Sequence, residues 1–206
     1  MIAIVNYGVG NLFSLRSSLG CCGSDGVVTS DPDIIRQADK IILPGVGAFA
    51  DAAEKLTRTG LDAVVKEQCA DGKPLLGICL GMQLLFEKSY EYGVHSGLGL
   101  IPGEIVPLKE CVPDGLKIPH MGWNSLSFRN PTRLYSGVSD GEYVYFVHSY
   151  FAETDAGYVT AVTDYGAEIT ASVARGNVLG TQFHPEKSGE SGLKILKAFC
   201  KGDFTC

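Results

Sequence analysis

The chain has 206 residues and 45% of them are hydrophobic, which is enough to bury the core of one globular domain, so we predict a single domain over residues 1–206. The formal charge is −6 and no basic run is present, which argues against nucleic acid or an anionic membrane as a partner. No stretch approaches the roughly 18 consecutive apolar residues that a membrane span requires.

The first part of the chain alternates strand-like and helix-like segments. In chain order we expect a strand at 1–6, a helix at 10–20, a strand at 26–30, a helix from 32 with Asp31 as its N-cap, a strand at 40–43, two helices between 48 and 72, and a strand at 74–78. This order predicts an α/β fold with a mostly parallel, doubly wound sheet and helices on both faces.

From about residue 103 the pattern changes to short strand-like runs. These runs, which end with NVLGTQF at 177–183, predict antiparallel strands and hairpins laid on the α/β core. The segment at 191–202 reads as an amphipathic helix whose apolar residues are Leu193, Ile195, Leu196 and Phe199.

Seven cysteines are present without a CxxC pair, at Cys21, Cys22, Cys69, Cys79, Cys111, Cys200 and Cys206. The number is odd, and the opening MIAIVNYGVGN lacks the basic leader of a secretory signal. We therefore expect reduced thiols and a cytoplasmic protein.

Cys79 stands at the corner between an apolar strand and a helix, in the stretch Gly77-Ile78-Cys79-Leu80-Gly81. The pattern G-x-nucleophile-x-G is typical of a tight strand-to-helix turn that exposes one reactive side chain. Backbone N–H groups at the start of the following helix favour a thiolate and can stabilise an oxyanion. Taken alone, the stretch is equally compatible with a small buried core cysteine.

The stretch GTQFHPEKS places His184 and Glu186 two residues apart. In an extended segment alternate residues share a face, so the carboxylate can orient the imidazole and the imidazole can exchange protons with a thiol. A solvated surface turn is the competing interpretation for this stretch alone. Together with Cys79 on its turn, the pair favours a nucleophile, base and orienting acid.

The stretch LPGVGAF follows another predicted strand, at the sheet edge where sites gather in open α/β folds. Its glycines allow a peptide to turn an N–H toward a developing negative charge, although an ordinary turn would look the same. The histidines are scattered without the spacing of metal ligands, and no phosphate-binding loop is present. We therefore predict no metal and no cofactor.

Together, PGVGAF, GICLGMQLLF and GTQFHPEKS resemble the class I glutamine amidotransferases, with Cys79, His184 and Glu186 in the positions of that family's Cys-His-Glu triad. The resemblance covers essentially the whole chain. NYGVGN, PHMGWN and YFVHSY are similar, more narrowly, to glutaminase subunits of imidazole glycerol phosphate synthases, which serve histidine biosynthesis.

The resemblance implies hydrolysis of L-glutamine to glutamate and ammonia through a thioester on Cys79. It implies an oxyanion hole formed by backbone N–H groups of Leu80 and of Val46 or Gly47. The substrate-binding residues that it implies are Gly45, Gln83, Glu91, Ser149 and Tyr150, with Glu91 paired to the substrate's α-ammonium group and the backbone at Ser149 and Tyr150 holding its carboxylate.

The resemblance also implies a partner, a cyclase subunit with a (β/α)8 barrel that receives the ammonia in a heterodimer and that, with its ligand, activates the glutaminase. The candidate interface residues are Asn11, Met121, Trp123, Tyr145 and Lys187. Trp123 is the only tryptophan, and a tryptophan ring is a common interface anchor, although a core position would explain it equally well.

Three alternatives remain open from the sequence. The chain could serve another synthase, for anthranilate or aminodeoxychorismate, because the triad is common to such subunits. It could be a non-catalytic regulatory subunit on the same fold, although intact Cys79, His184 and Glu186 count against this. It could also be a cysteine hydrolase of another substrate, such as a γ-glutamyl peptide.

Overall fold

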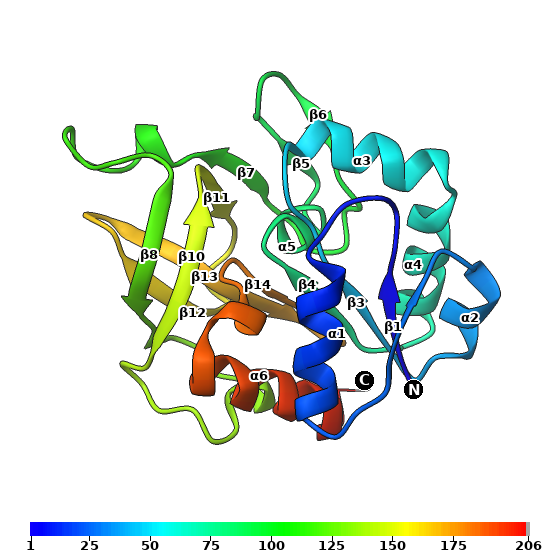
Figure 1. Ribbon diagram of the computed structural model, residues 1–206. Coiled ribbons are helices and arrows are strands. Elements are labelled where there is room, and N and C mark those ends of the chain that lie inside the picture. The colour runs from blue at the N-terminus through cyan, green and yellow to red at the C-terminus, as the bar shows by residue number, and fades with distance from the viewer. Residues whose placement is uncertain (205–206) are drawn as a thin grey trace.

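An eight-stranded mixed sheet forms the centre of the computed structural model, which describes residues 1–204 (Figure 1). Across the sheet the strands are β2 (Gly26–Thr29), β1 (Ile2–Val5), β3 (Lys40–Leu43), β4 (Leu75–Ile78), β14 (Val178–Thr181), β13 (Glu168–Arg175), β12 (Val159–Asp164) and β9 (Ser127–Phe128). The first five strands are parallel and the last three continue the sheet in antiparallel pairs. The predicted α/β fold with a mostly parallel doubly wound sheet is confirmed.

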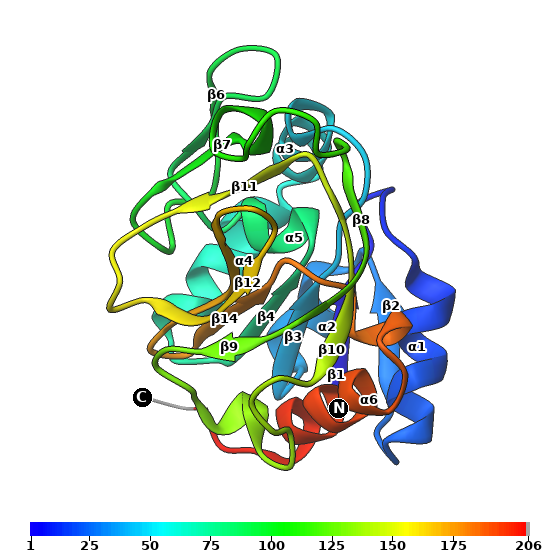
Figure 2. The ribbon, with the colours of Figure 1, turned by 90° about the vertical axis from the view of Figure 1, so that its left-hand side faces the viewer.

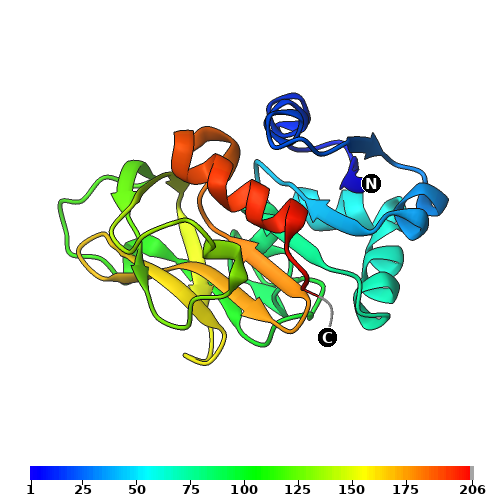
Figure 3. The same cartoon turned by 90° about the horizontal axis from the view of Figure 1, so that it is seen from below.

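Helices cover both faces of the parallel strands. One face carries α1 (Leu12–Cys21) and α6 (Gly189–Lys201), and the other carries α2 (Pro32–Gln37), α3 (Phe49–Arg58) and α4 (Leu61–Ala70). Figure 3 shows α1 (dark blue) and α6 (orange to red) on one side of the strands and α4 (teal) on the opposite side.

The strand β1 shows why these strands read as continuous apolar runs. Ala3 and Val5 pack in the core cluster that contains residues of α2, α3 and α4, whereas Ile2 and Ile4 pack in the cluster that contains residues of α1 and α6. Because both faces are covered, every position of the strand is buried and no polar alternation is left.

Two smaller sheets stand beside the main one (Figure 2). The first is a two-stranded ribbon of β8 (His120–Ser125) and β10 (Tyr143–His148). The second contains β11 (Tyr150–Glu153), β7 (Glu104–Pro107), β5 (Lys88–Ser89) and β6 (His95–Ser96). Short 3₁₀ turns occupy Leu108–Glu110, Arg133–Tyr135 and Pro185–Lys187. The run at 142–151 therefore divides at Ser149 between two sheets, which its sequence pattern did not reveal.

The expectation that the strands after residue 103 are antiparallel is wrong for β7, which pairs parallel with β5, and for β14. Strand β14 pairs antiparallel with β13 but parallel with β4, in the middle of the sheet. All four of its residues are buried, as expected for a strand covered on both faces. Its insertion beside β4 brings the segment after Thr181 to the corner at Cys79, whose N–H donates to the Thr181 carbonyl at 2.7 Å.

The predicted amphipathic helix is present as α6, but Leu193 lies outside its buried stripe. Ile195, Leu196 and Phe199 are fully buried, whereas Leu193 is 37% exposed. At about 100° per residue the buried three span one side of the helix, and Leu193 falls more than a quarter turn away from their centre.

No helix within residues 1–204 has the length and apolar character needed to cross a lipid bilayer. The six cysteines of this part of the chain are free, and Cys206 lies outside the described residues.

Candidate active site

Cys79 lies in a strained turn between β4 and the short helix α5 (Leu80–Gln83). Its φ of 55° lies in the left-handed region that residues with a side chain rarely adopt. The flanking glycines make this turn possible. A Cβ at Gly81 would stand 1.8 Å from the Leu43 carbonyl oxygen, and one at Gly77 would stand 2.7 Å from the Gly81 carbonyl oxygen. Only glycine therefore lets the turn pack against its neighbours while Cys79 points into the site.

His184 and Glu186 follow β14 and are buried beside the thiol. Glu186 Oε1 accepts a hydrogen bond from Nδ1 of His184 at 2.9 Å, and their side chains are only 4% and 2% exposed. Nε2 of His184 is buried and forms no hydrogen bond within residues 1–204, so this nitrogen is left for the Cys79 thiol, which influences the charge of the ring. The structure thus brings together the three predicted triad residues.

The charge state of His184 is set by these neighbours. Burial disfavours the imidazolium and lowers its pKa, but the Cys79 thiol and the Glu186 carboxylate outweigh burial and raise the pKa of His184 to about 10. A cationic imidazole beside a thiol favours the thiolate, which is the nucleophilic form of cysteine.

A cavity of about 300 Å³ opens above Cys79 and His184. Its walls contain most of the substrate-binding and oxyanion-hole residues expected from the sequence. The lining residues are Val46, Gly47, Cys79, Leu80, Gln83, Glu91, Pro119, Val147, His148, Ser149, Tyr150 and His184. This volume suits a small, polar molecule.

The loop after β3 closes one side of this cavity. A Cβ on Gly45 would lie 2.7 Å from the Gly81 nitrogen and 2.9 Å from the Leu80 Cβ, so glycine is required for the loop to contact the turn. Gly47 has a φ of +96° and open space where a Cβ would stand, while Val46 is 42% exposed. The peptide between Val46 and Gly47 therefore has room to turn.

The predicted donors of the oxyanion hole are free to bind a ligand. Within residues 1–204, no hydrogen bond uses the backbone N–H of Leu80, Val46 or Gly47 as donor. The helix that follows Cys79 is only one turn long, so the contribution of a helix dipole is small and the individual N–H groups matter more.

Gln83 faces the cavity but commits both amide N–H groups to the protein. Its Nε2 donates to the Tyr150 carbonyl at 2.9 Å and to Oε1 of Gln182 at 3.0 Å. Only the carbonyl oxygen of the Gln83 side chain remains for a ligand, and this oxygen can accept from an ammonium group.

Glu91 joins the cavity wall to the start of α3. One of its oxygens accepts from the backbone N–H of Phe49 at 2.5 Å, the first residue of that helix. A carboxylate at a helix N-terminus is held in place by the helix. Its second oxygen is left to meet a cation in the cavity.

The segment at Ser149 and Tyr150 turns its carbonyl groups into the protein. The Ser149 carbonyl accepts from the Leu108 N–H at 2.9 Å, and the Tyr150 carbonyl accepts from Gln83 and from Nδ1 of His148 at 3.0 Å. Any contact of this backbone with a bound carboxylate must therefore come from its N–H groups.

Sequence reasoning missed a second group of polar residues, of which His148 lines this cavity. Nε2 of His148 lies 3.0 Å from Nδ1 of His120, and Nε2 of His120 lies 3.0 Å from Oδ1 of Asn124. The ring of His120 also stacks between those of Phe146 and Tyr165. Burial lowers the pKa of His120, and burial together with the neighbouring His120 lowers the pKa of His148 to about 3.

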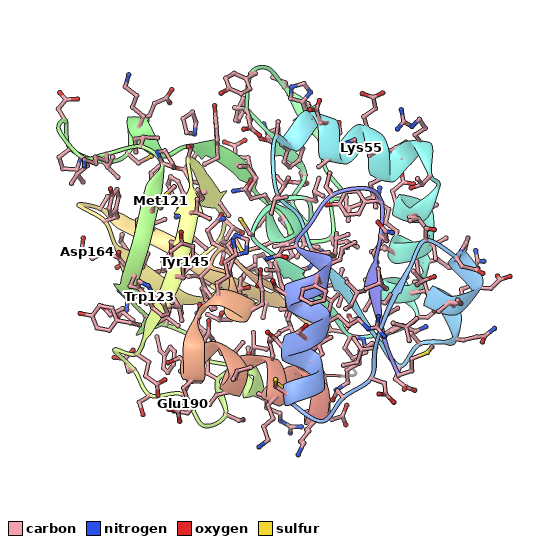
Figure 4. All side chains as sticks on the ribbon, in the orientation of Figure 1. Lys55, Met121, Trp123, Tyr145, Asp164 and Glu190 are labelled. Atoms are coloured by element: carbon pink, nitrogen blue, oxygen red, sulfur yellow. The ribbon has the colours of Figure 1, made fainter. Side chains whose placement is uncertain are left out.

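Four of the five predicted interface residues lie on one exposed surface formed by β8, β10 and the turn after β14. Met121 and Trp123 are 61% and 52% exposed, and the Trp123 ring meets the Tyr145 ring edge to face at 6.1 Å. Nζ of Lys187 lies 5.9 Å from the centre of the Tyr145 ring. Figure 4 shows Met121, Trp123 and Tyr145 on the two adjoining strands. The fifth residue, Asn11, is the N-cap residue of α1.

Within the part of the chain that the structure describes, no group of three or more His, Cys, Asp or Glu side chains is arranged to hold a metal ion.

Comparison with known proteins places this geometry in a family. The family model "Glutamine amidotransferase class-I" matches residues 4–202. The chain is 54% identical over 199 residues to the imidazole glycerol phosphate synthase subunit HisH of Bacillus cereus strain G9842, covering 97% of this chain and 93% of that protein. It is 51% identical over 200 residues to the same subunit of Caldanaerobacter subterraneus subsp. tengcongensis, covering 97% of both chains.

Solved structures show the same fold at lower sequence identity. A structure described as a glutamine amidotransferase superposes with a TM-score of 0.74 at 16% identity, covering 97% of this chain and all of that one. The structure of PurLQS from Thermotoga maritima gives a TM-score of 0.72 at 21% identity, covering 96% of this chain and 95% of that one.

Proposed function

Because this chain belongs to the class-I glutamine amidotransferases and, within them, to the HisH subunits of imidazole glycerol phosphate synthase, we propose that Cys79, His184 and Glu186 hydrolyse L-glutamine to glutamate and ammonia. We also propose that the whole chain acts as one domain. The observation that carries the site assignment is the buried His184, whose Nδ1 is held by Glu186 while its Nε2 is left to the thiol.

The reaction begins with the thiolate of Cys79 attacking the side-chain carboxamide carbon of glutamine. The C–N bond then breaks, and His184 gives its Nε2 proton to the leaving nitrogen, which departs as ammonia. The neutral imidazole next takes a proton from water, which attacks the thioester and releases glutamate and the thiol. Glu186 holds the tautomer and stabilises the imidazolium in each step.

The tetrahedral intermediate carries a negative oxygen that needs donors. The unused N–H of Leu80 and an N–H from Val46 or Gly47 supply them. Removing one such donor costs about 10²–10³ in rate in other acyl-transfer sites. The room for the Val46–Gly47 peptide to turn offers a means of activation, because only one of its orientations presents a donor.

The cavity accounts for the other end of glutamine. The free oxygens of Gln83 and Glu91 accept from the α-ammonium group, and the N–H groups at Ser149 and Tyr150 meet the α-carboxylate. Gly45 holds the loop against Leu80 so that these walls keep their spacing.

The partner that fits best is the cyclase subunit of an imidazole glycerol phosphate synthase, in a heterodimer that passes ammonia directly between two active sites for histidine biosynthesis. The exposed surface of Met121, Trp123, Tyr145 and Lys187 supports an interface there, because aromatic residues and a cation over a ring are typical anchors. Asn11 extends this interface in the proposal. The free thiols support a cytoplasmic location.

Glutamate release from glutamine tests the proposal, measured for the purified chain alone and with the cyclase subunit and its ribulosyl ligand. We expect strong activation by the partner and complete loss of glutamate release in Cys79→Ala. Activity that the partner does not change would contradict this subfamily assignment and direct attention to chorismate-using synthases. Failure of a glutamine-like electrophile to label Cys79 would contradict the catalytic assignment itself.

A further inference from the structure

Gln182 is a buried polar residue that the proposed mechanism does not use. Its side chain is fully buried, and its Nε2 lies 3.8 Å from the sulfur of Cys79. It stands two residues before His184, on the segment that β14 brings to the turn. An amide N–H that points to the sulfur can donate a hydrogen bond to the thiolate. This requires that the NH₂ group of the amide, and not its oxygen, faces the sulfur.

The surrounding hydrogen bonds decide which end of this amide faces the sulfur. The Tyr150 carbonyl can only accept, so the neighbouring group of the Gln83 amide must be its NH₂. The second N–H of that group points to Gln182 at 3.0 Å and requires an acceptor there. Gln182 must therefore place its oxygen toward Gln83 and its NH₂ toward Cys79.

The opposite side of the sulfur presents an acceptor. The Val147 carbonyl oxygen lies 3.9 Å from Sγ of Cys79 and can accept only from the protonated thiol. Ionisation removes that weak bond, whereas it strengthens the contact with the Gln182 amide, because hydrogen bonds to charged groups are shorter and stronger. The two contacts therefore favour different protonation states of the sulfur.

We propose that Gln182 is a further catalytic residue, which donates an amide N–H to the thiolate of Cys79 and is held in this orientation by Gln83. The part of this proposal that concerns rate rests on the proposed function. The part that concerns the ionisation of the thiol does not, because it can be measured without glutamine.

Other charged or titratable groups also face the thiol and must stay unchanged in the test. These are His184 with Glu186 behind it, Tyr7, His148 and Glu91. The Tyr7 hydroxyl donates to the Pro44 carbonyl at 2.7 Å, and burial raises its pKa far above its usual range, so it stays neutral. Glu91 and the neutral His148 are retained in every variant below.

The test is the pH dependence of alkylation of Cys79 by iodoacetamide in the full chain, followed by mass spectrometry of the peptide that contains this residue. Gln182→Met removes the donor at similar length, and Gln182→Glu keeps an acceptor for Gln83 but replaces the donor by an oxygen. We expect the midpoint of the alkylation rate to rise by about one pH unit in Gln182→Met, the usual scale for losing a hydrogen bond to a charged group, and further in Gln182→Glu.

Gln68 provides a matched control. It is also a buried glutamine, but it lies in α4 and does not line the cavity. Gln68→Met should leave the alkylation midpoint unchanged. If Gln182→Met and Gln182→Glu fold and keep the parent midpoint, the donor role of Gln182 is overturned, even if glutamine turnover falls. If the midpoint moves while no glutamine is hydrolysed by the parent, the proposed function fails and the donor role stands.

Gln83→Met tests the orienting step. We expect a smaller rise of the midpoint than in Gln182→Met, because the amide of Gln182 is then free to turn. Combining both changes should give no more than Gln182→Met alone, since the influence of Gln83 on the sulfur passes through Gln182. Additive shifts would overturn this route.

Discussion

Two buried histidines border the same cavity and have opposite acid–base properties. His184 follows β14 and His148 ends β10, and their exposed fractions are only 2% and 5%. The pKa of His184 is raised to about 10, whereas that of His148 is lowered to about 3. Burial acts on both rings in the same direction, because it disfavours the charged form, so burial cannot explain the difference.

The partners of the two rings explain it. His184 has a carboxylate at 2.9 Å on one nitrogen and a thiol that can ionise near the other. His148 has a carbonyl oxygen on one nitrogen and a second imidazole on the other, and neither brings a negative charge. Neighbouring charge therefore favours the cationic form of the first ring, as the proposed acid and base role requires, while the second ring donates to the Tyr150 carbonyl in the cavity wall.

Replacing each histidine tests the difference between the two rings most directly. His184→Gln should lower kcat/KM for glutamine by about 10³-fold or more, as expected when a member of a catalytic triad is lost. His148→Gln should lower it by no more than about 10-fold, because only the position of the wall changes. Steady-state glutamate release measures both losses. His95→Gln is the control, because His95 is only partly buried and does not line the cavity. Equal losses at His184 and His148 would show that both rings take part in proton transfer.

Replacing the Glu186 carboxylate by an amide tests how much of the raised pKa of His184 comes from that negative charge. Glu186→Gln keeps the shape of the side chain, so the expected loss is smaller, about 10²–10³ in kcat. The pKa of His184 should fall from about 10, because one of the two groups that raise it is neutralised. The pH profile of kcat and an NMR titration of the ring report this change. An unchanged His184 titration would mean that the thiol alone sets its charge.

The sequence contains enough information for the His184 region and too little for the His148 region. Cys79 lies in a local glycine pattern, and His184 and Glu186 alternate along an extended segment, so each local motif predicts chemistry. The same alternation extends back to Gln182 and could have identified that residue. No local pattern predicts that His120 and His148 meet across a β-ribbon, because their contact depends on the register of β8 with β10.

For the fold, too, local sequence patterns predict one part and not another. The β-α order of residues 1–78 predicts the parallel strands, because each covered strand is apolar at every position. The same property does not predict the neighbours of β14, because its apolar run is compatible with parallel and antiparallel pairing alike. Only the path of the whole chain determines that it inserts beside β4, and this insertion is what brings His184 to Cys79.

The pH dependence of stability should separate the two histidines by the sign of its slope. His184 has a folded pKa above the unfolded value of 6.5, so its contribution is complete below about pH 6.5 and is lost as pH rises through about 10. His148 has a folded pKa below 6.5, so its contribution is present above about pH 6.5 and is lost as pH falls toward 3.

Urea unfolding at several pH values, compared between parent and variants, measures these slopes. The stability difference between the parent and Glu186→Gln should shrink from neutral pH toward pH 10. The difference between the parent and His148→Gln should shrink from neutral pH toward acid. Two slopes of the same sign would contradict the assignment of opposite pKa shifts.

The smallest expected effect comes from placing a carboxylate beside His120. Oδ1 of Asn124 lies 3.0 Å from Nε2 of His120, and Nδ2 of Asn124 donates to the Asp164 carbonyl at 2.8 Å. Asn124→Asp replaces the amide by a carboxylate at the same place, so the lowered pKa of His120 should rise above 6.5, as that of His184 does beside Glu186. The free energy of unfolding should fall by about 1 kcal/mol, because the bond to the Asp164 carbonyl is lost.

Asn130→Asp is the matched control, because Asn130 also donates to backbone carbonyls, those of Ala156 and Val159, but forms no hydrogen bond with a histidine within residues 1–204. It should show the stability loss without the change at His120, which NMR titration of the imidazole Cε1–H signals resolves. A His120 that stays below 6.5 in Asn124→Asp would mean that burial dominates a neighbouring charge in this ribbon. The contrast between the two histidines would then arise from the Cys79 thiol rather than from the carboxylate.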